Sequence, residues 1–106
     1  MKYLNDANVT LTTLEVKTLE CILSQGSFYE ESSDYEDIDK MKSCFFGWEI
    51  DESELKGCRG ALASLVKKGI IQVFDDDGVG YMTNYAFKFD ESKGYHKLDL
   101  TNITVR

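Results

Sequence analysis

The stretch ELKGCRGALASLVKKG at residues 54–69 decides the fold that the sequence predicts. Its apolar residues share one side of a helix at 100° per residue: Leu55, Cys58, Leu62, Leu65 and Val66. Gly57 and Gly60 lie on the opposite side, although a glycine inside a helix costs about 0.5–1 kcal/mol relative to alanine. Two lysines and a glycine end the stretch, as is typical of a helix C-terminus. We therefore predict a helix from Asp51 or Ser53 to Lys68, with both glycines facing outward.

The outward side of this predicted helix carries only small or basic residues. They are Ser53, Lys56, Gly57, Arg59, Gly60, Ser64 and Lys67. Small residues let another surface approach the helix backbone closely, and the bases can contact phosphates. This pattern predicts a contact face for DNA or for a partner helix. The alternative, that exposed glycines are simply tolerated or that the helix bends there, stays open.

Working outward, IIQVF and VGYMT flank DDDG and predict a hairpin. Upstream, Thr12 and Glu15 form a capping-box pattern that predicts a helix over 13–25. The apolar face expected for that helix is Leu11, Leu14, Leu19, Ile22 and Leu23. We expect a second helix over 36–46, from the spacing of Ile38, Met41 and Phe45, and a short strand over 48–50. The segment 85–89 either extends the second strand of the hairpin or begins a fourth helix, and its alternation favours the strand. The segment 91–106 is an edge strand, an arm or mobile.

The order helix, helix, short strand, helix, hairpin is that of a winged helix-turn-helix. The segment ALASLVKKGIIQVFDDDGVGYMT, residues 61–83, resembles the recognition helix and wing of MarR-like regulators. The matching residues are Leu62, Leu65, Lys68, Gly69, Ile70, Ile71 and Thr83. The resemblance spans roughly residues 11–85. It implies an α+β winged-helix domain over 1–90 that binds DNA through its third helix, with a C-terminal tail over 91–106.

The charge of the chain is acidic overall but uneven. Nineteen acids stand against twelve bases, for a net charge of −7, which opposes non-specific binding to nucleic acid. The acids cluster in two places: Glu30, Glu31, Asp34, Glu36 and Asp37, and then Asp75, Asp76 and Asp77. These clusters are either solvated loops or an acidic docking surface. On the helix over 51–68, by contrast, bases outnumber acids.

Catalysis, a cofactor and a bound metal are not expected. Cys21, Cys44 and Cys58 are widely spaced, and His96 is the one histidine, so the ligand spacing of a zinc site is missing. The aspartates at 75–77 lack the spacing of a calcium loop. The aromatic residues Trp48, Tyr81 and Tyr85 either stack on single strands or pack the hairpin against the helices. Without an 18-residue apolar run or a signal-like segment, we expect a cytoplasmic protein with no membrane contact.

Two functions remain in competition. The first is a small regulator that binds duplex DNA through the helix over 51–68. It would act as a dimer, since two half-sites supply the affinity that one module lacks, and the tail from Leu98 to Val105 is the expected dimer element. The second is an acidic protein-binding module that docks on a basic nucleic-acid-handling protein, as small viral inhibitors that occlude a DNA channel do. A mobility-shift assay at low salt separates the two.

Overall fold

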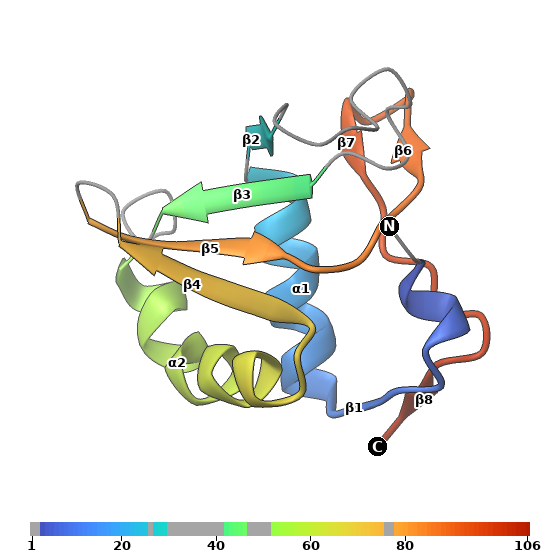
Figure 1. Ribbon diagram of the computed structural model, residues 1–106, viewed down its shortest axis with the longest axis horizontal. Helices are drawn as coiled ribbons and strands as arrows, with labels where there is room; N and C mark the ends of the chain where they lie inside the picture. The colour runs from blue at the N-terminus through green and yellow to red at the C-terminus, as the bar shows by residue number, and fades with distance from the viewer. Residues whose placement is uncertain (1–2, 26, 30–41, 47–51, 76–77) are drawn as a thin grey trace.

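The computed structural model describes residues 3–25, 27–29, 42–46, 52–75 and 78–106 of the chain. These residues form an α+β fold with two helices and several short strands (Figure 1). The elements are η1 (Leu4–Asp6), β1 (Thr10–Leu11), α1 (Thr13–Gln25), β2 (Ser27–Tyr29), β3 (Lys42–Phe46), α2 (Glu52–Lys67), β4 (Ile71–Asp75), β5 (Val79–Thr83), β6 (Phe89–Asp90), β7 (Tyr95–His96) and β8 (Thr104–Val105). Neither described helix combines the length and hydropathy that crossing a bilayer requires.

Helix α1 begins with the predicted capping box. The backbone N–H of Thr12 donates to Glu15 Oε1 at 2.8 Å, and the backbone N–H of Glu15 donates to Thr12 Oγ1 at 3.1 Å. The helix over 13–25 is therefore confirmed. Its buried residues are Leu19, Ile22 and Leu23, together with Glu15 and Thr18. The prediction was wrong for Leu14, which is 44% exposed because the buried face is centred further round the helix, where Glu15 and Thr18 lie.

Helix α2 confirms the helix predicted from the opening stretch. Cys58, Ala61, Leu62 and Leu65 are buried on its inner side. The helix ends in a Schellman motif, in which the Gly69 N–H donates to the Val66 carbonyl and the Ile70 N–H donates to the Leu65 carbonyl, both at 3.0 Å. Gly69 has φ 76°, a left-handed conformation that favours glycine. Leu65 and Ile70 are both fully buried, so the motif also fixes the chain on the core.

The main sheet has four antiparallel strands in the order β2-β3-β5-β4. The hairpin β4–β5 is confirmed, with Ile71 opposite Thr83 and Asp75 opposite Val79. Strand β3 overturns the helix expected over 36–46, at least over its last five residues. The short run KSCFF pairs with β2 on one side and β5 on the other, and these cross-strand bonds outweigh a local helical spacing. Residues 36–41 and the strand expected over 48–50 lie outside the described residues.

Helix α1 lies between α2 on one side and the β6–β7 hairpin on the other (Figure 1). It packs against α2, β3 and β7, while α2 packs against β4. The core where these elements meet contains Leu4, Leu11, Leu19, Ile22, Leu23, Leu62, Leu65, Ile70, Ile71 and Phe87.

The C-terminal segment returns to the start of the chain. Strand β7 pairs with β6, and β8 pairs in parallel with β1. Leu98 and Ile103 are half-buried against the core, so the segment 91–106 forms edge strands and packs on its own domain. The strand expected over 85–89 is present only at its end, because β6 begins at Phe89 and Ala86 makes a single bridge to Tyr3.

Candidate functional site

The outer face of α2 is open, as the sequence predicts. Gly57 and Gly60 are exposed, and no atom beyond the local helix backbone lies within 4 Å of the position that a Cβ would take at either residue. Arg59 and Lys67 are also exposed on α2. The backbone of Ser53 and Lys56 lies in the first turns of α2, but their side chains lie outside the described set. The glycines therefore face solvent, and not the protein interior.

Ser64, the remaining residue of the seven expected on this face, points instead to α1. Its hydroxyl donates to Glu15 Oε2 at 2.8 Å. Lys68 Nζ donates to Glu15 Oε1 at 2.6 Å and to the Thr10 carbonyl at 2.7 Å. Ser64 and Lys68 thus tie α2 to the start of α1. The contact face that α2 offers to a partner is therefore smaller than the sequence alone suggests, and Lys68 is engaged within the protein.

Glu15 is the centre of this link, with 1% of its surface exposed. Burial on its own would raise the pKa of Glu15. The hydrogen bonds from Lys68, Thr12 and Ser64 and the charge of Lys68 outweigh burial, so the pKa lies below its ordinary value of 4.5. Glu15 is therefore held as a carboxylate, and its oxygens are already taken by donors within the protein.

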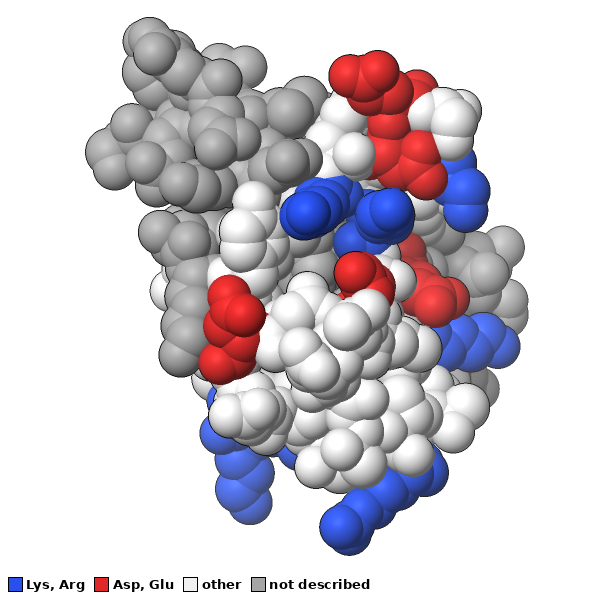
Figure 2. Space-filling model, turned by 90° about the vertical axis from the view of Figure 1, so that its right-hand side faces the viewer, with Lys and Arg blue, Asp and Glu red and all other residues white. Residues whose placement is uncertain are grey.

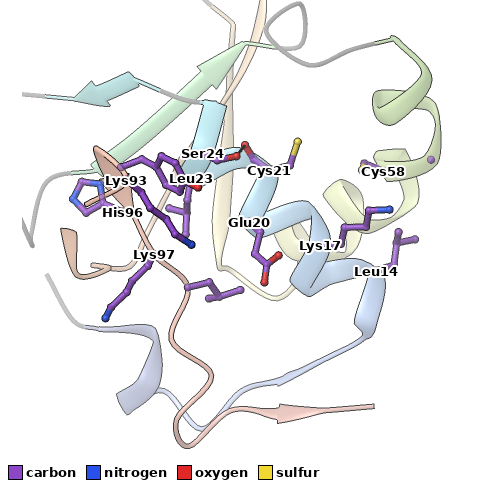
Figure 3. A pocket seen from close by; sticks show the side chains of 13 residues that line it. Leu14, Lys17, Glu20, Cys21, Leu23, Ser24, Cys58, Lys93, His96 and Lys97 are labelled. Carbon is purple, nitrogen blue, oxygen red and sulfur yellow. Dashed lines mark hydrogen bonds between the residues drawn. The ribbon is translucent and has the colours of Figure 1, made fainter. Parts of the chain in front are cut away.

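A groove of about 630 Å³ lies over one face of α1, with α2 on one side and the β7 region on the other (Figure 3). Its lining residues are Leu14, Lys17, Glu20, Cys21, Leu23 and Ser24 from α1, Gly57 and Cys58 from α2, and Lys93, Tyr95, His96, Lys97 and Leu98 from the β7 region. This volume is typical of a ligand-binding cleft. The groove is the candidate site that the described residues define best.

The groove combines an apolar base with a basic border. Lys17, Lys93 and Lys97 are exposed at its edge, and Glu20 is the one acid among its lining residues. His96 is fully buried in its wall, where its ring meets the edge of Phe89 at a centroid distance of 5.4 Å and an interplanar angle of 73°. This packing gives His96 a structural role in holding β6 against β7.

The described residues hold no group of His, Cys, Asp or Glu side chains that could bind a metal ion. Cys58 is buried and Cys21 is half-buried, and no disulfide joins these two described cysteines. Tyr81 and Tyr85 are half-buried against the core, which favours packing over a stacking surface. Trp48 and the side chain of Cys44 lie outside the described set.

The acidic clusters fall mostly outside the described residues. Asp75 is exposed at the end of β4, whereas Asp76, Asp77 and the acids over 30–37 belong to the segments that are not described. The described residues hold ten bases and nine acids, so their formal charge is +1; the remaining residues hold ten acids and two bases. On the face of β6, β7 and the C-terminal segment, basic side chains gather beside acidic ones (Figure 2).

The sequence did not predict the groove. Lys17 and Lys97 are eighty residues apart, and no local pattern joins them. One signal was available, since Leu14, Lys17, Cys21 and Ser24 recur at three- and four-residue spacing and share a second face of α1. Comparison with protein-family models, curated proteins and solved structures gives no match to this chain.

Proposed function

We propose that this chain is a small, non-enzymatic regulator that binds duplex DNA through the outer face of α2. The observation that carries the proposal is the open space over Gly57 and Gly60, beside the exposed bases Arg59 and Lys67. A helix surface without Cβ atoms lets a duplex backbone come close, and the two bases supply phosphate contacts.

The arrangement of α2 and the strands supports a winged-helix role. The antiparallel hairpin β4–β5 follows α2 directly, and β3 adds a strand to it. In the MarR-like resemblance, α2 would serve as the recognition helix and β4–β5 as the wing, whereas the short strand was expected over 48–50. The described residues contain two helices rather than three, so the proposal depends on the α2–β4–β5 unit alone.

The charge distribution supports DNA contact more than the net charge of −7 suggests. The described residues carry a formal charge of +1, so the electrostatic barrier to phosphate comes from the other segments. A dimer would double the few contacts that one α2 offers. Since Leu98 and Ile103 pack on their own core, the dimer contact falls to Leu100 and Val105, which are 40% and 41% exposed.

A mobility-shift assay tests this function at about 50 mM salt, where phosphate contacts are strong. The duplexes are a random sequence and the DNA beside the protein's own gene. We expect a shift that the double variant Arg59→Ala with Lys67→Ala weakens, with the salt slope reduced by about 2 because each base contributes about one phosphate contact. The matched control Lys88→Ala with Arg106→Ala removes the same charge elsewhere and leaves the shift unchanged. Absence of any shift contradicts the proposal.

A second candidate function has its own support in the sequence. Ten of the nineteen acids lie in the segments 30–41, 47–51 and 76–77, where Lys40 is the one base. These acidic segments would be attracted to a basic protein surface, such as that of a nucleic-acid-handling enzyme. This candidate predicts a steeply salt-dependent complex with a basic protein and no DNA shift in the same assay.

A further inference from the structure

We propose that the groove across α1 binds an acidic amphipathic helix of a partner protein. The proposal does not require DNA binding, because the groove lies over α1 and its lining does not include Arg59 or Lys67; Gly57 alone belongs to both surfaces. It depends on the shape of the groove, on its apolar base and on the placement of its lysines.

The groove has the length that a short helix needs. Leu14, Lys17, Cys21 and Ser24 follow one another along one face of α1, and ten residues of helix span roughly 15 Å. Two to three turns of a second helix cover this distance. The walls are formed by α2 at Gly57 and Cys58 and by the β7 region on the other side of α1 (Figure 3).

The base of the groove offers apolar contacts along its length. Leu14 is 44% exposed at one end, and Cys21 and Leu98 are half-buried further along. An amphipathic helix that places apolar residues at positions i, i+4 and i+7 matches this spacing. Burying Leu14 in the complex removes one of the largest exposed apolar side chains among the described residues.

The lysines that border the groove determine which charge a bound helix should carry. Lys17 lies on one side of α1, while Lys93 and Lys97 lie on the opposite side (Figure 3). A helix in the groove would therefore have an ammonium group near each flank. Acidic residues on both flanks of the helix would pair with these groups, and a basic helix would be repelled.

Gly57 contributes no side chain to the wall of the groove that α2 forms. Gly57 is one of the lining residues, and no atom beyond the local helix backbone lies within 4 Å of the position that its Cβ would take, so we expect a large side chain there to narrow the groove. Gly60 is also exposed, also has no atom beyond the local helix backbone within 4 Å of its Cβ position, and does not line the groove. The two glycines are thus a matched pair, in which one position blocks the groove and the other does not.

The probe is an acetylated and amidated helical peptide of about 16 residues, dye-labelled, with leucines at i, i+4, i+7 and i+11 and glutamates beside them. A small panel varies the leucine spacing, and binding to the full chain is followed by fluorescence anisotropy. We expect Gly57→Leu to weaken the best binder by at least about tenfold and Gly60→Leu by less than about twofold. Lys17→Glu with Lys97→Glu also weakens it by at least about tenfold. A charge-reversed peptide, with lysine for glutamate, does not bind.

Three results would overturn the proposal: no panel member binds, Gly57→Leu and Gly60→Leu weaken binding equally, or the charge-reversed peptide binds as well. As a control, thermal unfolding of both leucine variants checks that they are folded. The variant Lys17→Glu with Lys97→Glu changes the charge of the groove and leaves both glycines in place, so its effect on peptide binding is a separate test.

Discussion

At the scale of single residues, Glu15 both caps α1 and links α1 to α2, and only the first of these contacts is visible in the sequence. Its capping-box contact with Thr12 follows from three-residue spacing and was predictable. Its bonds to Ser64 and Lys68 cross 49 and 53 positions of the chain, and no local pattern contains them. For this reason the sequence placed Ser64 on the outer face of α2, although its hydroxyl turns inward to a buried carboxylate.

The lowered pKa of Glu15 predicts how stability depends on pH. A carboxyl whose pKa is lower in the folded state stabilises the fold above its unfolded pKa, near 4.5, and loses this contribution as the pH falls through the folded pKa. Glu15→Gln should lower the free energy of unfolding by about 1–3 kcal/mol at pH 7, because the neutral amide loses the ion pair with Lys68 and can accept hydrogen bonds at only one of its two terminal atoms. The difference between the two proteins should shrink below pH 4.5.

Urea unfolding at pH 7 and at pH 3 measures this difference. Glu20→Gln is the matched control, because Glu20 is exposed on the same helix and its substitution should leave stability nearly unchanged at both pH values. An equal loss of stability from Glu15→Gln at pH 3 and pH 7 would contradict an ionised Glu15.

At the scale of elements, the sequence predicts those that carry strong local signals. Helix α1 has its capping box, α2 has its apolar face and Gly69, and the sequence between β4 and β5 contains an Asp-Gly pair. Strand β3 was missed because Met41 and Phe45 suggest a helical repeat, while five residues are too few to separate helix from strand. The sheet decides this case, since both edges of β3 are bonded to neighbouring strands.

Replacing Gly60 in α2 and Gly69 in its C-terminal cap with alanine should change the free energy of unfolding in opposite directions. Gly60→Ala should raise the free energy of unfolding by about 0.5–1 kcal/mol, because alanine favours helix and its methyl group meets no neighbouring group. Gly69→Ala should lower it by about 1 kcal/mol, because φ 76° strains any residue with a Cβ. Thermal unfolding of both variants is the measurement, and a stabilised Gly69→Ala protein would rule out the Schellman cap.

At the scale of the whole molecule, long-range contacts build what local patterns could not predict. The groove joins α1, α2 and the β7 region, so its lysines meet only after the chain has folded. The same is true of the two chain ends. Thr13 N–H donates to the Arg106 carbonyl at 3.2 Å, Arg106 N–H donates to the Leu11 carbonyl at 2.9 Å, and Asn5 Nδ2 donates to the Thr101 carbonyl at 2.6 Å.

These contacts predict that the last residues hold the N-terminal segment in place. Removing residues 101–106 deletes β8 and the half-buried Ile103, and leaves the Leu11 carbonyl and the Thr13 N–H without their partner. We expect stability to fall by about 2–4 kcal/mol, the sum of a few backbone hydrogen bonds and one half-buried side chain. The amide of Thr13 should exchange faster in the truncated protein, because it donates to Arg106 in the full chain. The control Thr104→Val keeps the backbone pairing of β8 and changes only an exposed side chain, so it should unfold like the parent. A truncated protein as stable as the full chain, with unchanged exchange at Thr13, would show that β8 contributes nothing to the fold.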